Sequence, residues 1–311
     1  MLSPTVSVLI VTHNNAREIA ACLDALAHQT RIAHEIIVVD NASVDTTVAC
    51  MTQAGGVQWI ANGENLGFAA AVNQASRLAQ GRDLLLLNPD TVVHDCAVDR
   101  LVAFLEAHPD VGIAAPRVLD AEGRIRYNCF AFETPWSMFW FGVGVGPLRR
   151  VRDRMLRRPA WDITADTPQE VEAVTGAALL VRRESFERLG GLDERFFMYG
   201  EDGDFCLRAR RAGWRVMLMP VAVVTHLGGA SAPLDAPRLN GMIGGHLLES
   251  RYRYTQKYWG WPAVVALRLA NAAAGALFLL VSRLLTDGAK RTNLARTGRL
   301  LWATHALRTE G

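Results

Sequence analysis

The chain has 311 residues, of which 50% are hydrophobic and 21% charged, so we expect a substantial core in one large domain or two smaller ones. Its five cysteines are scattered without a CxxC pair, which argues against a disulfide framework and against a zinc knuckle. The net charge of +2 is unevenly distributed. Residues 251–311 hold ten Lys or Arg and two acids, a net charge of +8, so residues 1–250 carry a net charge of −6. Such a basic segment predicts contact with an anionic surface, either nucleic acid or lipid headgroups.

The first residues, MLSPTVSVLIVTHNN, contain only a short apolar run, with no basic residue before it and no small-residue cleavage site. This pattern predicts a strand rather than a signal peptide. Together with the unpaired cysteines it predicts a cytoplasmic protein.

The first 120 residues alternate between two hydrophobic periods. Continuous apolar runs predict strands at residues 6–14, 35–43, 57–63, 83–90 and 111–118. Helical spacing predicts helices at residues 16–28, 44–53, 67–80 and 97–108. This alternation indicates a mostly parallel sheet covered by helices on both faces. Ligands bind such sheets at the carboxyl ends of the strands, which here hold His13–Asn14, Asp40–Asn41, Asn62–Asn65 and Asn88–Asp90.

Residues 121–168 differ in kind, because FAFETPWSMFWFGVGVG crowds aromatic residues and PLRRVRDRMLRRP then supplies six Arg with one Asp. Two interpretations stay open: a solvated insertion with a local hydrophobic patch, or a mobile loop beside a membrane or an acceptor site. Regular elements return afterwards. We predict a strand at 170–181, helices at 184–190 and 202–212, and a strand at 214–226.

The segment WGWPAVVALRLANAAAGALFLLVSRLL has an unbroken apolar portion, Ala272–Val281, that is shorter than the roughly 20 residues of a membrane span. Arg268 and Asn271 interrupt it. We therefore predict a helix lying in the membrane interface, with Trp259 and Trp261 at the headgroup level. The alternative is a helix packed against the rest of the chain or a partner subunit. No helix-turn-helix pattern or RNA-binding pattern accompanies the basic segment, so no nucleic-acid partner is expected.

The acidic cluster in FMYGEDGDFCLR raises the question of a catalytic base. If a helix begins near Glu201, Asp202 shares a face with the apolar residues that follow it, whereas Asp204 and Arg208 are spaced to pair on the polar side. An inward carboxylate has two explanations. It caps the helix, or it lines a cleft and accepts a proton from a substrate hydroxyl.

Three further strand ends carry groups suited to a nucleotide. Asn88 and Asp90, in LLLLNPD, offer oxygen ligands for Mg²⁺ or Mn²⁺ holding a diphosphate, although Asn-Pro-Asp also simply favours a turn. Asp40 can accept the ring N–H of a pyrimidine, and His226 can ligate a metal through a neutral ring nitrogen.

These segments, together with VSVLIVTHNN, IIVVDNASVD, NLGFAAAVNQ, TGAALLVRRESFERLGGLDERFFMYGEDGDFCLR and VTHLGG, resemble family 2 glycosyltransferases of the GT-A fold, particularly their rhamnosyltransferase-like branch. The resemblance covers residues 5 to about 230. It implies a Rossmann-like, mostly parallel α/β sheet flanked by helices, with a C-terminal helical extension at the membrane interface. It also implies an inverting transfer from a nucleoside diphosphate sugar.

Carried onto this chain, the resemblance assigns residues to three roles. Asp202 would be the base, with Glu201 beside it. Asp90, Asn88 and His226 would hold Mg²⁺ or Mn²⁺ and the diphosphate. The nucleotide sugar would be bound by Thr12, Asn14, Asp40, Asn65, Gly67 and Asn73, as well as by Asn88 and Asp90. Asn88 replaces the first acid of the commoner Asp-x-Asp pattern, a form shared with the rhamnosyltransferase branch, so dTDP-rhamnose is the favoured donor.

The expected organisation is a nucleotide-sugar-binding half at 1–120, the insertion at 121–168, an acceptor and catalytic half at 169–250, and basic amphipathic helices at 251–311. The acceptor would be a glycan or a lipid-linked glycan of cell-surface polysaccharide synthesis, reached from the inner face of the cytoplasmic membrane. The alternatives are a UDP-sugar (galactofuranosyl or glucosyl) transferase, a nucleotidyltransferase, and a catalytically inactive sugar-nucleotide-binding or scaffold protein. A nucleotidyltransferase would normally carry a Gly-rich basic loop after its first strand, where this chain has THNNAREI.

Overall fold

The computed structural model describes residues 4–143, 161–228, 241–284, 286 and 288–303. The chain divides into two compact units, which are described separately. The first comprises Met1–Phe132, Ala160–Phe197 and Glu201–Gly229, and the second comprises Glu133–Pro159, Met198–Gly200 and Ala230–Gly311. The Arg-rich stretch 147–159 lies outside the described residues.

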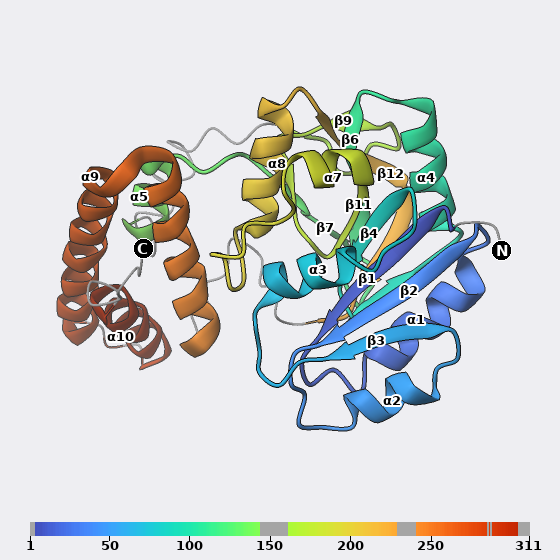
Figure 1. The fold of residues 1–311 in the computed structure, drawn as a ribbon. Coiled ribbons are helices and arrows are strands. Elements are labelled where there is room, and N and C mark those ends of the chain that lie inside the picture. The colour runs from blue at the N-terminus through green and yellow to red at the C-terminus, as the bar shows by residue number, and fades with distance from the viewer. Residues whose placement is uncertain (1–3, 144–160, 229–240, 285, 287, 304–311) are drawn as a thin grey trace. The chain divides into compact units, whose positions relative to one another are not determined.

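The first unit is built on a mixed sheet with the strand order β3-β2-β1-β4-β11-β6-β12-β5 (Figure 1). Its strands are β1 (Val6–Thr12), β2 (His34–Asp40), β3 (Val57–Ala61), β4 (Asp83–Leu87), β5 (Thr91–Val93), β6 (Val111–Leu119), β11 (Ala178–Arg182) and β12 (Arg215–His226). Two short strands pair at its margins, β7 (Ile125–Arg126) with β6 and β9 (Gln169–Glu170) with β12. A separate pair joins β8 (Cys129–Phe130) to β10 (Ala173–Val174).

Strand direction places the ends of distant segments at one edge. β1, β2, β3 and β4 run parallel to one another, β11 runs antiparallel to both β4 and β6, and β12 runs parallel to β6. The carboxyl ends of β1, β2, β4 and β12 therefore lie at the same edge of the sheet, where β11 begins. This agrees with the predicted mostly parallel sheet, with β11 and β5 as antiparallel additions.

The predicted strand at 170–181 is wrong as a single element. It is broken into β9, β10 and β11, because the residues between them bond to other parts of the first unit. The Thr175 N–H donates to the Asn128 carbonyl at 2.8 Å, and the Gly176 N–H donates to the Asp202 carboxylate at 3.0 Å. The chain thus leaves the sheet for seven residues and re-enters it as β11.

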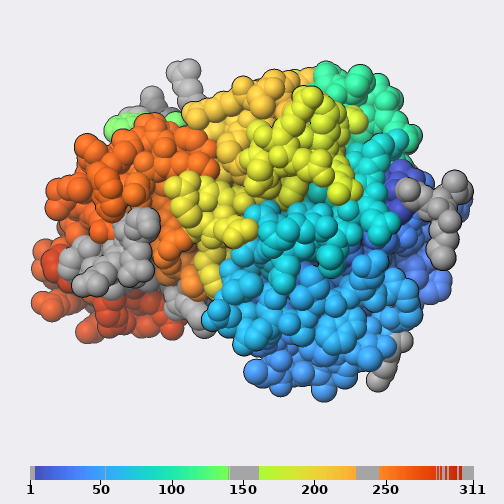
Figure 2. Space-filling model, viewed as in Figure 1, coloured from blue at the N-terminus to red at the C-terminus, as the bar shows by residue number. Residues whose placement is uncertain are grey.

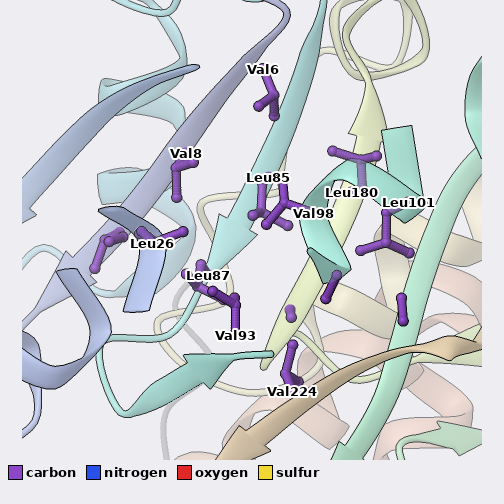
Figure 3. Packing of buried hydrophobic residues seen from close by; sticks show 14 of the residues in the cluster. Val6, Val8, Leu26, Leu85, Leu87, Val93, Val98, Leu101, Leu180 and Val224 are labelled. Carbon is purple, nitrogen blue, oxygen red and sulfur yellow. The ribbon is translucent and has the colours of Figure 1, made fainter. Parts of the chain in front are cut away.

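Helices cover both faces of this sheet. One face carries α1 (Ile19–Gln29), α2 (Thr47–Gln53) and α4 (Ala97–Ala107), and the other carries α3 (Phe68–Ser76), α7 (Arg183–Arg188) and α8 (Glu201–Arg211). Because side chains alternate along a strand, Val8 and Ile10 of β1 face the first set while Leu9 and Val11 face the second. Figure 3 shows the first of these two cores, in which Val8, Leu85 and Leu101 gather between sheet and helices. The predicted helices are confirmed, with ends that differ by a few residues.

Segments far apart in sequence form one surface of the first unit. In Figure 2 the cyan atoms that include α3 adjoin the yellow atoms that include α7 and the residues after it. The contact is specific, since the Asn73 side chain of α3 donates to the Leu192 carbonyl at 2.8 Å.

The second unit consists, in its described part, of α5 (Pro135–Val143), α9 (Gly241–Leu284) and α10 (Gly288–Ala303). Gly260 has φ 76° and ψ 179°, just before Pro262, and breaks α9 into two arms. The arms fold back on each other, because the Asn271 side chain donates to the Tyr252 hydroxyl at 2.9 Å (Figure 1). By length and composition alone, Gly245–Leu284 meets the requirement for a membrane span, with a mean hydropathy of 2.0 in its most apolar 18-residue window, although the unbroken apolar run in the sequence is shorter. The predicted position in the membrane interface stays a prediction.

Candidate active site

The carboxyl edge of the sheet brings together most of the residues predicted for the site. Thr12 ends β1 and is paired in register with Asp40, which ends β2. Leu87 ends β4 beside β1, so the Asn88–Asp90 turn begins at the same edge. His226 ends β12 and is paired with Thr91, directly after that turn.

Asp40 organises the loops that follow β1 and β2. Its side chain is buried, and its Oδ1 accepts hydrogen bonds from the hydroxyl of Thr12 at 2.9 Å and that of Ser43 at 2.5 Å. Its Oδ2 accepts one bond from the Ser43 N–H at 2.9 Å, which leaves lone-pair capacity on that oxygen. Asn14 joins the same network, since its N–H donates to Ser43 Oγ at 2.8 Å and its side chain accepts from the Val44 N–H at 2.9 Å.

A cluster of amide side chains supports the next loop. Asn41 Nδ2 donates to the Gly67 carbonyl at 3.1 Å, and Asn62 Nδ2 donates to Asn41 Oδ1 at 3.0 Å. Asn62 and Gln74 also exchange two hydrogen bonds, at 3.0 and 3.1 Å. These amides fix the turn that contains Gly67.

Gly67 itself must be glycine. Its φ is +85°, and a Cβ there would lie 2.5 Å from the Phe197 carbonyl oxygen. Asn65 closes the turn by accepting from the Gly67 N–H at 3.0 Å. The turn is therefore held rigidly at the carboxyl edge, beside β2 and β3.

Asp90 and His226 form the candidate diphosphate and metal position. Asp90 Oδ1 is buried, lies 3.0 Å from Nε2 of His226, and receives no hydrogen bond from the described residues. Gly228 closes over the same carboxylate, since a Cβ there would lie only 1.7 Å from Asp90 Oδ2. Burial and the Asp90 charge also raise the pKa of the nearby Cys22 thiol to about 12.

A divalent metal fits this donor set. An unsatisfied carboxylate oxygen facing a ring nitrogen provides two ligands for such an ion. Among the described residues no group of three or more His, Cys, Asp or Glu side chains could hold a metal, so phosphate oxygens or water would have to complete the coordination. Asn88 contributes backbone contacts to the turn, with its carbonyl accepting from the Thr91 N–H at 3.2 Å.

Two adjacent residues connect this turn to Asp202. The Gly176 N–H donates to Asp202 Oδ2 at 3.0 Å. The carbonyl of the next residue, Ala177, accepts from the Asn88 N–H at 3.0 Å and from the Thr91 hydroxyl at 3.3 Å. A half-buried carboxylate and the Asn-Pro-Asp turn are thus attached to the same short segment, although 114 positions separate residues 88 and 202 in the sequence.

The comparison with protein families decides the identity of the chain. Residues 7–190, more than half of the chain, match the model of Glycosyl transferase family 2. The chain belongs to this family. Residues 163–227 also match the model described as the N-terminal domain of galactosyltransferase.

Among curated relatives, this glycosyltransferase is 27% identical over 246 residues to the N-acetylglucosaminyl-diphospho-decaprenol L-rhamnosyltransferase of Mycobacterium tuberculosis, covering 72% of this chain and 76% of that protein. It is 25% identical over 236 residues to the low-salt glycan biosynthesis hexosyltransferase Agl10 of Haloferax volcanii, covering 75% and 69%. The predicted family and its rhamnosyltransferase-like relatives are confirmed.

Solved structures confirm the GT-A fold. The mannosyltransferase PcManGT from Pyrobaculum calidifontis, in complex with GDP-Man and Mn²⁺, aligns with TM-score 0.58 at 19% identity, over 98% of this chain and 88% of that one. GalNAc-T7 with UDP, GalNAc and Mn²⁺ aligns with TM-score 0.59 at 18% identity over 83% of this chain, which spans about half of that structure's length.

In this glycosyltransferase the acidic cluster is arranged differently from the predicted pattern. The helix begins at Glu201 as predicted, so Asp202 lies in its first turn and is not its cap. However, Glu201 and Asp204 are buried rather than solvated. Asp204 pairs with Arg208 at 2.8 Å, as predicted, but in the interior, where Arg208 also donates to two backbone carbonyls.

Glu201 is a buried acid whose pKa is strongly perturbed. Its Oε2 is buried and receives no hydrogen bond from the described residues. Burial raises the pKa of Glu201 well above its usual value, and the negative charges of Asp202 and Asp204 raise it further. Helical periodicity could not predict the burial of Glu201, because the residues that surround the first turn of α8 come from other segments of the chain.

Asn73, predicted to lie along the nucleotide, has a different role in the structure. Its Nδ2 donates to the Leu192 carbonyl at 2.8 Å and to Glu194 Oε1 at 2.9 Å, while its Oδ1 accepts from the Leu192 N–H at 2.9 Å. The whole amide is used to attach α3 to the segment before α8.

Sequence reasoning missed Ser43 and Gln74 as supporting residues, and it noted Asn62 only as a strand end. Ser43 bridges Asp40 and Asn14, and Gln74 pairs with Asn62. The sequence offered only a weak indication of these two residues. Both missed residues stand inside segments that carry the family resemblance, one after IIVVD and one in GFAAAVNQ.

A hollow of about 520 Å³ at the opposite end of β11 from the carboxyl edge is lined by arginine and glutamate side chains. Its ion pairs join Arg82 to Glu106 at 2.8 Å, Arg183 to Glu187 at 2.7 Å, and Arg188 to Glu184 at 2.8 Å. The fourth arginine of the lining, Arg182, donates to the Val111 carbonyl at 3.2 Å and to the Leu105 carbonyl at 2.7 Å. Because all four guanidinium groups are already held by partners in the protein, we place the chemistry at the carboxyl edge.

Proposed function

We propose that this glycosyltransferase moves rhamnose from a nucleoside diphosphate donor, dTDP-rhamnose first, to a glycan or lipid-linked acceptor, with inversion at the anomeric carbon. The observation that carries this proposal is the attachment of Asp202 and the Asn88–Asp90 turn to the adjacent residues Gly176 and Ala177. It supports a site in which a base and a leaving diphosphate lie on either side of one sugar.

Asp202 is the proposed base. It removes the proton from an acceptor hydroxyl as that oxygen attacks the anomeric carbon, and the bond to the diphosphate breaks in the same step. The Gly176 and Gly203 N–H groups, at 3.0 and 2.7 Å, hold the carboxylate in place. Glu201, whose pKa is raised by burial and by the charges of Asp202 and Asp204, is proposed to support the base from the neighbouring position.

The donor is proposed to bind along the carboxyl edge. Asp40, with Thr12 and Asn14 ordering its loops, receives the base of the nucleotide through Oδ2. The Asn65–Gly67 turn lies along the nucleotide. When bound, Mg²⁺ or Mn²⁺ held by Asp90 and His226, with Asn88 nearby, would neutralise the charge that develops on the departing diphosphate.

The relatives support the substrate classes. The Mycobacterium tuberculosis relative is named an N-acetylglucosaminyl-diphospho-decaprenol L-rhamnosyltransferase. A Myxococcus xanthus relative, 28% identical over 248 residues that cover 75% of this chain and 18% of that protein, is named an O-antigen biosynthesis protein. With a lipid-linked acceptor, the proposed location is the inner face of the cytoplasmic membrane. The partial match to a galactosyltransferase model favours a UDP-sugar as the second candidate donor.

The test combines a donor panel with one substitution. Hydrolysis or transfer from dTDP-, UDP- and GDP-sugars, with and without Mn²⁺, identifies the donor. Asp202→Asn should lower turnover by about 10² to 10⁴, the usual contribution of a general base, with little change in donor binding. Turnover close to that of the unmodified protein would remove Asp202 from this role.

A further inference from the structure

We propose that the second unit docks on anionic phospholipid through one apolar face of α9, which lies in the plane of the membrane interface instead of crossing the bilayer. This deepens the proposed membrane location and rests on it. We call this surface the lipid-facing stripe. Its members, on the arm after Gly260, are Trp261, Val265, Leu269, Leu277, Leu280 and Leu284.

The stripe is long, apolar and exposed. Its residues are between 48% and 78% exposed, and the 3.6-residue period places them within one half of the helix circumference. The opposite half is buried within the second unit and includes Val264, Leu267 and Phe278. The buried half packs inside the second unit, but the exposed apolar half is in contact with water. The boundary between the headgroups and the acyl chains of a membrane would cover it.

The two polar residues that interrupt the apolar sequence do not interrupt the stripe. Asn271 donates to the Tyr252 hydroxyl at 2.9 Å, and the Arg268 guanidinium lies 5.1 Å from the centre of the Tyr252 ring. Both therefore face the first arm of α9. Arg268 and Asn271 are therefore not on the lipid-facing stripe, and their polarity does not argue against lipid contact there.

Charge selects the kind of lipid. The sequence from 261 to 303 contains six Lys or Arg and a single acid, Asp287. Four of the arginines are exposed at the end of α9 and along α10, namely Arg283, Arg291, Arg296 and Arg299. Anionic headgroups are attracted to such a surface, whereas a second copy of the chain would bring two basic helices together.

The packing of α10 favours an interfacial position over a span. Gly275 and Gly298 bring the two helices into backbone contact, since a Cβ on either would lie under 3.0 Å from a backbone oxygen of the other. A bilayer-crossing α9 would carry the basic residues of α10 into hydrocarbon, which is strongly unfavourable. An arm lying flat keeps them at the headgroups, with Trp259 and Trp261 at the same depth.

The experiment is flotation of the full chain with vesicles of phosphatidylcholine, with or without about one third phosphatidylglycerol. The protein should float with the anionic vesicles and be released by high salt and by an alkaline carbonate wash. Leu269→Glu with Leu280→Glu should lower the bound fraction at least about tenfold. The matched control is Leu78→Glu, at an exposed leucine of the first unit, and should float normally.

Three outcomes would overturn the proposal. Resistance to carbonate would indicate a span, equal binding to both vesicle types would remove the charge argument, and loss of a dimer instead of lipid binding would identify a second copy as the occupant. Donor hydrolysis measured on the same variants without vesicles separates this proposal from the catalytic one. An active Asp202→Asn protein that still floats would refute only the catalytic roles.

Discussion

Glu201 offers a direct thermodynamic test of the buried acidic cluster. Glu201→Gln replaces a carboxyl whose pKa is raised by burial, and then by Asp202 and Asp204, with a neutral group of the same shape. In the unfolded chain the carboxyl releases its proton near pH 4.3, but in the folded chain it keeps that proton to higher pH. The free energy of unfolding therefore decreases as the pH rises from about 4.3 to the folded pKa.

Within that window the loss is at most about 1.4 kcal/mol for each pH unit. The Gln variant has no proton to release, so its stability relative to the unmodified protein should grow with pH by the same amount. A fixed penalty for burying the new amide shifts the whole curve without changing this slope. Urea unfolding measured at several pH values between about 4.5 and 7 gives both curves.

Glu187→Gln is the matched control, because it makes the same substitution at a side chain that is 62% exposed. If the Glu201→Gln and unmodified curves run parallel, Glu201 is ionised in the folded protein and the argument from burial fails.

Two glycines provide further predictions. Gly228→Ala should force Asp90 to move, because the new Cβ would lie 1.7 Å from the Asp90 Oδ2. In a thermal shift assay, the donor should then stabilise the variant far less than the unmodified protein, while the melting temperature without donor changes little. Gly275→Val should separate α9 from α10 and lower the unfolding temperature of the second unit, whereas donor hydrolysis by the first unit should persist. Unchanged donor binding in the first variant, or unchanged melting in the second, would contradict the respective contact.

Periodicity predicted most of the first unit because its elements are long and strongly patterned. The runs that became β1, β2 and β4 are apolar on both faces, which few structures other than a covered parallel sheet allow. The break between β9 and β11 escaped prediction, because nothing in EVEAVTGAALLV shows that Gly176 bonds to a helix 26 residues later. Such bonds depend on tertiary position and leave no local pattern.

The site was predictable at strand ends and much less so elsewhere. Asp90 and His226 were expected to meet because both follow strands that end at the same edge, and they lie 3.0 Å apart. The partners of the Asn73 amide could not be predicted, because an amide on a helix gives no sign of what its oxygen and nitrogen bond, and its role along the nucleotide stays a prediction. The length of the apolar helix was underestimated, because counting an unbroken apolar run ignores the direction in which Arg268 and Asn271 point.

The shared segment at Gly176 and Ala177 has a consequence for how this enzyme can vary. The proposed base, Asp202, and the Asn88–Asp90 turn proposed to hold the diphosphate are attached to two adjacent residues, so their spacing does not depend on the packing of distant helices. Loops around the sheet can lengthen, shorten or change composition as acceptors differ between organisms, while the reach from nucleophile to leaving group stays the same. Changes of acceptor would then leave the geometry of the glycosyl-transfer step unchanged.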